Sequence, residues 1–396
     1  MNKPPIKKNP IKDLGIYLHI PFCRRKCGYC DFHSGPCPDK KELSEFIQAL
    51  KRQISETAPV AGDALVDSVY FGGGTPLMLG APALCGILRH IRRLFRLTKD
   101  AEVTVELNPE STDKKSMKAL RRAGFNRASL GMQSSSDEEL SWLSRLHSHS
   151  DTVAAARCIR DAGFQNLSVD LMFGLRGQTV SGFLGTVEKA SELRPTHISC
   201  YGLKLESGVP LASSGPQSLP DGDAQADMYA EACAALKSLG FSHYEISNFA
   251  LPGFESRHNM KYWTLAPYLG FGPSAHSDCF GRRYSTIRST GAYIEAVNTG
   301  GALICELETI SKDERAREYI MLGLRTARGI SSGEFTKRFR LPFDRLEDRL
   351  MFFSRGGLAL LENGRWRLSE RGFFVSNAII SDILDGISAE ICAREK

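Results

Sequence analysis

Three cysteines lie within eight residues near the start of the chain, in the stretch HIPFCRRKCGYCDF. Cys23, Cys27 and Cys30 have the spacing C-x3-C-x2-C and directly follow an apolar segment. Thiols this close together favour a metal centre, and the spacing is typical of an iron–sulfur cluster. A zinc site or a loop of reactive cysteines is the alternative. Zinc would need a fourth ligand, for which His33 and Cys37 are the local candidates, and the chain has no second C-x2-C pair.

A four-iron cluster held by three cysteines has one iron without a protein ligand. A small molecule with suitable donor atoms can bind that iron. The sequence therefore predicts a cluster whose fourth position is kept open for a ligand. Other residues of the chain should then line the space around this ligand.

Glycine and polar residues further along the chain are candidates for that lining. The stretch YFGGGTP places Gly73, Gly74 and Thr75 at the end of an expected strand, where glycine lets backbone N–H groups approach a ligand closely. Polar residues occur in three more expected strands: Glu106 in VELNPE, Gln133 in LGMQS and Asp170 in SVDLMFG. Functional side chains of β/α barrels gather at the C-terminal ends of the strands. Each of these residues could instead have only a structural role, such as a tight turn or the cap of a loop.

Short apolar runs alternate with amphipathic stretches over the first 250 residues. The expected strands are GIYLHI, ALVDSVYFGGG, AEVTVELNP, NRASLGMQ, NLSVDLMFGL and HISCYGL, and the expected helices cover residues 41–57, 81–95, 112–123, 151–162 and 181–193. A Gly-Phe pair recurs between helix and strand, at Gly124-Phe125, Gly163-Phe164 and Gly240-Phe241, and suits a helix end followed by a core side chain. This repetition predicts an α/β fold, an incomplete parallel, TIM-like β/α barrel in residues 1–250.

The rest of the chain has a different pattern. Residues 251–310 are rich in Gly, Pro and aromatic residues without a sustained period, which predicts a connecting or binding segment. Residues 311–396 return to helical patterns and include the hairpin LALLENGRWRLSE, with Asn363-Gly364 as its turn. We expect a smaller C-terminal domain of the winged-helix type. Carboxylates surround its short basic cluster TKRFR, so we expect no nucleic-acid binding and a structural or covering role.

Composition indicates a globular protein that is not embedded in a membrane. The 396 residues are 42% hydrophobic, no charge-free apolar run reaches the length of a membrane span, and the basic N-terminus is not followed by a signal-peptide core. Eight of the 11 cysteines are scattered singly, as in proteins of reducing compartments. The net charge of +6 is spread along the chain. A cytoplasmic location is therefore expected.

The cysteine motif after a first strand, with YLHIPFC before it and Tyr29 before the third cysteine, resembles the radical S-adenosylmethionine (SAM) enzymes. Within them it is similar to the oxygen-independent coproporphyrinogen III oxidase branch. This resemblance covers nearly the whole chain and implies a 4Fe–4S cluster on the three cysteines, with SAM on the open iron. It also implies SAM contacts at Tyr17, Tyr29, Gly73, Gly74, Thr75, Glu106, Gln133, Arg145, Asp170 and His276.

Two details separate this chain from the oxidases of that branch. The oxidases have a further cysteine two positions after the third, where this chain has Phe32, and they carry a longer N-terminal extension. The stretches CDF and RHNMKYW resemble a subgroup of haem chaperones instead. The resemblance thus implies a chaperone that binds haem and delivers it to respiratory haemoproteins. The alternative is radical oxidative decarboxylation of coproporphyrinogen III, and the sequence leaves open whether the protein is an enzyme.

The segment RHNMKYW supplies the haem candidates His258, Tyr262 and Trp263. A neutral imidazole can ligate haem iron, and Tyr and Trp offer flat apolar faces to a porphyrin. Arg257 and Lys261 could meet the propionates. The other reading is that His258 is a hydrogen-bonded structural histidine. A homodimer and transient association with a membrane surface complete the expected partners.

Overall fold

The structure, a computed structural model, describes residues 11–213 and 218–394. Its centre is one twelve-stranded sheet with the order β14-β13-β12-β11-β1-β4-β5-β6-β7-β8-β10-β9. The parallel strands are β11 (Tyr268–Phe271), β1 (Leu14–Ile20), β4 (Leu65–Gly73), β5 (Arg96–Leu107), β6 (Arg127–Gln133), β7 (Asn166–Phe173) and β8 (His197–Gly202). The order of the strands is linear and does not close on itself, which confirms the predicted incomplete parallel barrel.

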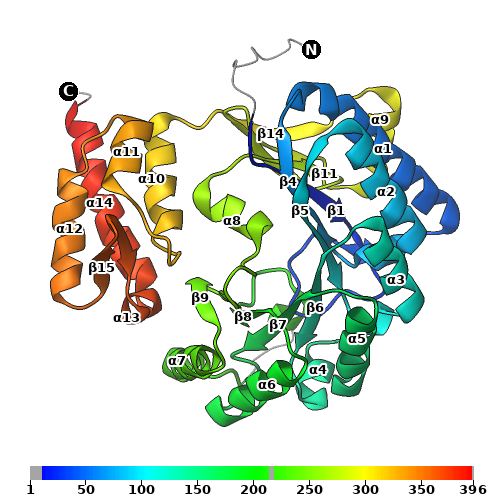
Figure 1. Cartoon of the computed structure of the whole chain (residues 1–396), viewed down its shortest axis with the longest axis horizontal. Helices are drawn as coiled ribbons and strands as arrows, with labels where there is room; N and C mark the ends of the chain where they lie inside the picture. The colour runs from blue at the N-terminus through cyan, green and yellow to red at the C-terminus, as the bar shows by residue number, and fades with distance from the viewer. Residues whose placement is uncertain (1–10, 214–217, 395–396) are drawn as a thin grey trace.

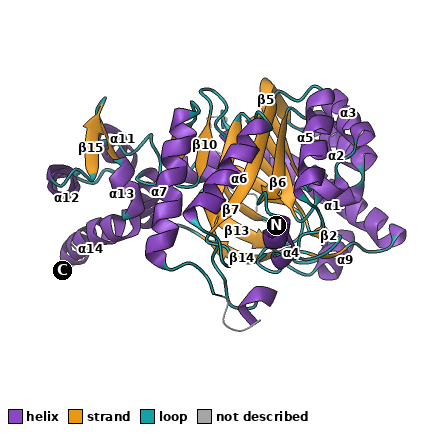
Figure 2. Cartoon of the chain, turned by 90° about the horizontal axis from the view of Figure 1, so that it is seen from below, coloured by secondary structure: helices purple, strands orange, loops and turns teal. Residues whose placement is uncertain are grey.

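Helices cover the outer face of the barrel (Figures 1 and 2). They are α1 (Lys40–Ala61), α2 (Ala81–Leu94), α3 (Lys114–Ala123), α4 (Asp137–Trp142), α5 (His149–Asp161), α6 (Val180–Glu192), α7 (Gly222–Ser238) and α9 (Thr290–Thr299). One continuous core joins the strands to these helices except α4. Among the described helices, none combines the length and apolar character needed to cross a bilayer.

The repeated Gly-Phe joints have the geometry that the sequence predicts. Gly124, Gly163 and Gly240 have positive φ angles of 101°, 93° and 88°, which suits glycine at a helix C-terminus. Each following phenylalanine is buried in the barrel core. The joint thus ends the helix and aims the chain into the next strand.

Residues 251–310 contain strands that the sequence pattern did not predict. Besides β11, the antiparallel strands β12 (His276–Cys279), β13 (Arg282–Thr286) and β14 (Ile304–Glu308) extend the sheet beyond β1. At the other edge, β9 (Ser242–Glu245) and β10 (Asn248–Ala250) extend it beyond β8. The added strands are only three to five residues long, too short for a period to stand out in a Gly- and Pro-rich sequence.

The C-terminal domain has its own hydrophobic core and the expected order of elements. Its helices are α10 (Lys312–Gly323), α11 (Ser332–Phe339), α12 (Asp344–Arg355), α13 (Glu370–Phe374) and α14 (Ser376–Arg394), and β15 (Ala359–Glu362) pairs with β16 (Arg365–Leu368). Asn363 and Gly364 both have positive φ, as a tight hairpin turn requires. The short helix α8 (Arg257–Thr264) lies between the barrel strands and this domain in Figure 1.

Candidate functional site

The cysteine loop runs between β1 and α1, and backbone hydrogen bonds fix it to the glycine-rich loop after β4. The N–H of Gly74 donates to the carbonyl oxygen of Ile20 (2.8 Å), and the N–H of Thr75 donates to that of Phe22 (2.7 Å). A Cβ on Gly74 would lie only 2.6 Å from the Phe22 oxygen. The close approach of the two loops therefore requires glycine at position 74.

A histidine at the end of β1 holds the far side of the cysteine loop. His19 Nε2 lies 2.8 Å from the carbonyl oxygen of His33, and its Nδ1 lies 3.0 Å from the hydroxyl of Tyr17. A carbonyl oxygen only accepts, so Nε2 carries the proton and Nδ1 accepts from Tyr17. Burial lowers the pKa of His19 to about 4, so the ring is neutral at physiological pH.

All three cysteines of the motif are half-buried and line one cavity of about 450 Å³, here called the central cavity. Thr75 Oγ1 donates to Cys23 Sγ at 3.7 Å, and Arg145 Nη1 donates to Cys27 Sγ at 3.4 Å. Burial raises the pKa of Cys23 and Cys30, while the hydrogen bond from Thr75 lowers that of Cys23. Donors of this kind favour the thiolate over the thiol.

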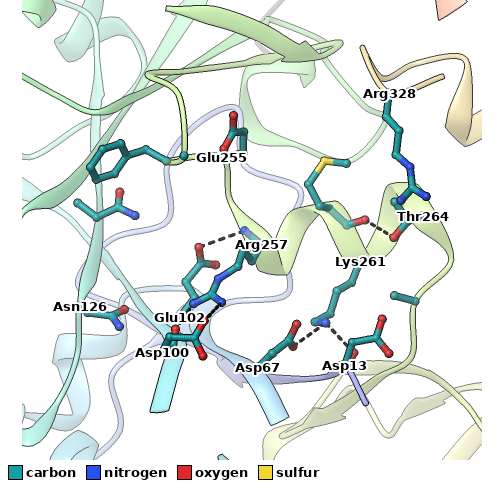
Figure 3. A pocket seen from close by; sticks show the side chains of 15 residues that line it. Asp13, Asp67, Asp100, Glu102, Asn126, Glu255, Arg257, Lys261, Thr264 and Arg328 are labelled. Carbon is teal, nitrogen blue, oxygen red and sulfur yellow. Dashed lines mark hydrogen bonds and ion pairs between the residues drawn. The ribbon is translucent and has the colours of Figure 1, made fainter. Parts of the chain in front are cut away.

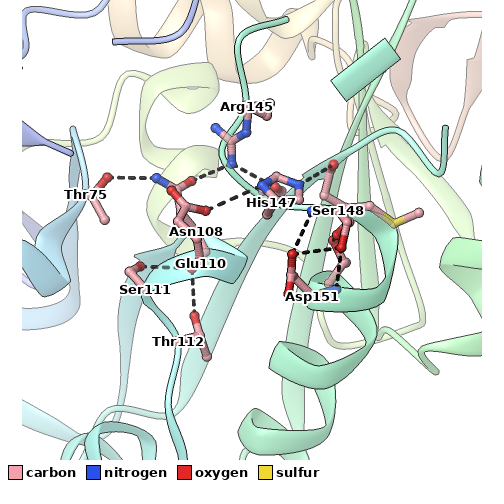
Figure 4. Close-up of polar contacts among 12 residues, drawn as sticks. Thr75, Asn108, Glu110, Ser111, Thr112, Arg145, His147, Ser148 and Asp151 are labelled. Carbon is pink, nitrogen blue, oxygen red and sulfur yellow. Dashed lines mark hydrogen bonds and ion pairs between the residues drawn. The ribbon is translucent and has the colours of Figure 1, made fainter. Parts of the chain in front are cut away.

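Arg145 and Thr75 belong to one hydrogen-bond network, joined by a residue that the sequence analysis missed (Figure 4). Asn108 Oδ1 accepts from Arg145 Nη2 at 2.8 Å, and Asn108 Nδ2 donates to Thr75 Oγ1 at 2.7 Å. Arg145 Nη2 also donates to the carbonyl oxygen of Gly131 at 3.1 Å. Asn108 directly follows the strand that ends near Glu106, so its position at a strand end was the available signal.

Two carboxylates face the same cavity from neighbouring parts of the sheet. Glu106 accepts from the Tyr70 hydroxyl (2.8 Å) and from the Gly73 N–H (3.0 Å). Burial nevertheless raises the pKa of Glu106 to about 7. Asp170 accepts from three serine hydroxyls, those of Ser129, Ser168 and Ser199, and burial raises its pKa as well.

The sequence analysis also missed a buried cation, Arg127, in the same cavity as these carboxylates. Arg127, at the start of β6, lines the central cavity with only 1% of its surface exposed. Its Nε and Nη1 have no hydrogen-bond partner among the described residues. No motif marked this arginine, because its burial depends on the assembly of distant strands around it.

Most of the predicted SAM residues meet in the central cavity. Its lining includes Tyr29, Gly73, Gly74, Thr75, Glu106, Gln133, Arg145 and Asp170 together with the three cysteines. Gln133 ends β6 with a φ of 66°, a conformation that non-glycine residues adopt mainly at special sites. Tyr17 lies inside the barrel beside His19 and does not line the cavity, and His276 is exposed at the start of β12.

The haem candidates lie elsewhere, on α8. His258 is 1% exposed, and both ring nitrogens have partners: Nδ1 meets the Ser68 hydroxyl and Nε2 meets the Tyr262 hydroxyl, each at 3.0 Å. Burial lowers the pKa of His258 to about 3. Tyr262 and Trp263 are half-buried on the same helix, and neither they nor His258 line the central cavity.

A second cavity of about 630 Å³, here called the α8 cavity, lies on the other side of α8 (Figure 3). Its lining combines the N-terminal parts of parallel strands with α8 and loops, and includes Asp13, Asp67, Asp100, Glu102, Glu255, Arg257, Lys261 and Arg328. Lys261 Nζ pairs with Asp67 (2.6 Å) and Arg257 Nη1 pairs with Asp100 (3.0 Å). Glu102 accepts the backbone N–H groups of Arg257 and His258 and thereby caps the helix.

Comparison with known proteins gives the class that the barrel and its cysteine site define. Residues 17–190 match the Radical SAM superfamily, and residues 310–375 match the HemN C-terminal domain. The solved structure of coproporphyrinogen III oxidase (HemN) from Escherichia coli has the same fold, with a TM-score of 0.84 at 22% identity over 95% of this chain and 91% of that one. The fold and the site therefore define a radical SAM protein with a HemN-type C-terminal domain.

Relatives in sequence give the family. The chain is 33% identical to "Heme chaperone HemW" of Bacillus subtilis, over 83% of this chain and 88% of that protein. It is 33% identical to the protein of the same name from Mycobacterium tuberculosis (strain H37Rv), over 96% and 97%. The chain belongs to the HemW family, which confirms the resemblance to haem chaperones.

The radical SAM domain implies a 4Fe–4S cluster and SAM, and the residues present fit both groups. Three half-buried thiols open on one cavity, two of them receive hydrogen bonds, and no other described cysteine lines that cavity. No group of three or more His, Cys, Asp or Glu in the described ranges is arranged to hold a single metal ion. Cys23, Cys27 and Cys30 would hold the cluster, which supplies one-electron reduction of SAM when bound.

Proposed function

We propose that this chain is a haem chaperone that binds haem and delivers it to respiratory haemoproteins. The observation that carries the proposal is the 33% identity to proteins named heme chaperones over almost the whole chain. Phe32 supports it, since the resembling oxidases have a cysteine at that position. The cluster and SAM would occupy the central cavity, with Glu106, Gln133 and Asp170 among the SAM contacts.

We further propose His258, Tyr262 and Trp263 as residues that affect haem binding. Ligation of iron by His258 Nε2 would require the Tyr262 hydroxyl to move away, because the two atoms are hydrogen-bonded. Arg257 and Lys261, which the sequence offers as partners for the propionates, each pair with a carboxylate. A role of this segment in haem binding therefore involves a rearrangement of α8.

Titration of the anaerobically reconstituted chain with haemin tests the proposal. We expect a shifted Soret band in the wild type and weaker binding in His258→Ala. His197→Ala is a matched control, because His197 is also a fully buried histidine bonded to a serine and a tyrosine hydroxyl. Equal losses of haemin affinity in both variants would mean that His258→Ala acts only by disturbing the packing. An unchanged haemin spectrum on addition of the wild type would refute the haem proposal.

The alternative activity is oxidative decarboxylation of coproporphyrinogen III. It is assayed with the reconstituted chain, SAM and a reductant, by measuring protoporphyrinogen. Sustained turnover would contradict a purely chaperone role. We expect none, and we expect haem transfer to a haem-depleted respiratory cytochrome instead.

The remaining partners are proposals of the same kind. We place the protein in the cytoplasm, with a homodimer and transient contact with a membrane surface during haem delivery. The edge strand β14 is a place to test the dimer, since Ile304 and Leu307 on it are exposed. Sedimentation of the wild type and of Leu307→Lys, with and without haemin, measures whether this edge joins two chains.

A further inference from the structure

The most exposed large apolar side chain of the described residues lies beside the cysteine motif. Phe32 is 64% exposed and lines the central cavity, two residues after Cys30. Leu146, which follows Arg145, is 40% exposed and lines the same cavity. Exposed apolar side chains that gather at the opening of a cavity commonly mark a binding site.

Two cations lie in the same loop as Phe32. Arg24 and Arg25 are exposed, line the central cavity, and have no ion pair or hydrogen bond with the described residues. We name the four residues Arg24, Arg25, Phe32 and Leu146 the cavity mouth. Around it lie two unpaired guanidinium groups and one exposed carboxylate, that of Asp31, so the excess of positive charge beside apolar surface suits a flat apolar ligand that carries carboxylates.

We propose that haem docks across the cavity mouth. Its apolar ring would cover Phe32 and Leu146, and its propionates would meet Arg24 and Arg25. This inference rests on the proposed function and assigns it a surface. It differs from ligation at His258, because His258 is buried and does not line the central cavity.

The charges inside the molecule explain why the ring would lie at the mouth. The interior of the central cavity already offsets its own charges, because the carboxyl groups of Glu106 and Asp170 face the buried guanidinium group of Arg127. Propionates directed outward meet the two free guanidinium groups instead. The same placement leaves the interior available for SAM.

The α8 cavity fits a dianion less well than the mouth does. Each cation that lines it already pairs with a carboxylate: Arg257 with Asp100, Lys261 with Asp67, and Arg328 with Glu334. Binding propionates there would require breaking one of these pairs, whereas Arg24 and Arg25 need no such exchange.

The test uses the full chain with its cluster reconstituted, titrated anaerobically with haemin and with haemin dimethyl ester. We expect Phe32→Ser to weaken haemin binding roughly tenfold, the effect of losing part of the burial of one phenyl ring. The double variant Arg24→Ala/Arg25→Ala should weaken binding of haemin but leave binding of the dimethyl ester unchanged, since the ester has no propionate charge.

A matched control is Phe352→Ser. Phe352 is 58% exposed, with its ring centroid 5.2 Å from the Arg349 guanidinium carbon, so it is also a highly exposed phenyl ring, but on the C-terminal domain. Its haemin affinity should equal that of the wild type. Cluster absorbance and SAM binding, measured on every variant, show that the loop itself is intact.

Two results overturn the inference and differ in meaning. Wild-type haemin affinity in both Phe32→Ser and Arg24→Ala/Arg25→Ala would remove the docking site and leave the proposed function standing. Absence of haemin binding by the wild type would remove the proposed function and the docking site together.

Discussion

Ionisation of Glu106 should govern how tightly the central cavity binds a cationic ligand. Its carboxyl group has a pKa raised to about 7 by burial, even though Tyr70 and Gly73 donate hydrogen bonds to it. SAM carries a positively charged sulfonium, which the ionised carboxylate attracts and the neutral acid does not. We therefore predict that SAM affinity of the reconstituted chain rises with pH as Glu106 ionises.

The size of the effect follows from the pKa of Glu106. With a pKa of about 7, roughly one molecule in eleven carries the carboxylate at pH 6 and roughly ten in eleven carry it at pH 8. A ligand that binds only the ionised form then gains about tenfold in affinity between these pH values, or about 1.4 kcal/mol. Glu106→Gln should lose this gain and bind SAM as weakly at pH 8 as at pH 6, apart from titration of SAM itself.

Equilibrium binding of SAM at pH 6, 7 and 8 under anaerobic conditions measures the prediction. The amino group of SAM also titrates, but it does so equally in both proteins, so the difference between wild type and Glu106→Gln isolates the carboxyl group. Glu245→Gln is the control, because burial also raises the pKa of Glu245 to about 7 and this residue does not line the central cavity. Parallel pH profiles for wild type and Glu106→Gln would refute the reasoning.

Three further predictions concern the cysteine loop and the barrel. Arg145→Met should remove the hydrogen bond to Cys27 and leave buried acceptors unpaired, which lowers the free energy of unfolding by about 1–3 kcal/mol and lowers the cluster midpoint potential. Urea unfolding measures the first effect and redox titration the second, and an unchanged potential would contradict the prediction. Gly74→Ala should yield protein with less iron per chain, because its Cβ would lie 2.6 Å from a backbone oxygen, whereas Gly86→Ala, with 3.8 Å of space in α2, should retain full iron. Burial raises the pKa of Glu245 to about 7 in the folded chain, so its neutral carboxyl group stabilises the fold fully below the pKa of the unfolded state and loses this contribution as pH rises. The stability of the cluster-free chain should therefore fall by about 3 kcal/mol from pH 4.5 to pH 7 through Glu245. Urea unfolding of Glu245→Gln should lack this part of the pH dependence, and an equal slope in both proteins would count against the prediction.

The sequence predicts the central cavity well because strand ends in a parallel barrel meet at one side. Glu106, Gln133 and Asp170 are far apart in the chain, yet each belongs to a recognisable strand, so their meeting follows from the fold class. The glycine-rich stretch could be placed in the same way. Asn108 could have been found by this rule, while Arg127 could not, since nothing local distinguishes a buried arginine from an exposed one.

The position of α8 could not be predicted from the periodicity of its sequence. RHNMKYW is polar and aromatic enough for a binding loop, but the segment forms a helix whose histidine and lysine are buried against β1 and β4. Gly15 leaves the room for Lys261, since a Cβ there would lie 2.6 Å from the lysine Cδ. Such complementarity between distant positions appears only when the strands are assembled.

The contact between His19 and the carbonyl oxygen of His33 has a consequence for the life of the metal centre. The imidazole stays uncharged at the acidity of a cell, so this brace does not loosen when acidity changes, and it involves none of the iron-binding sulfurs. If oxygen destroyed the cluster, this hydrogen bond would remain and hold the cysteine loop in position. A new cluster could then be inserted without refolding of the loop.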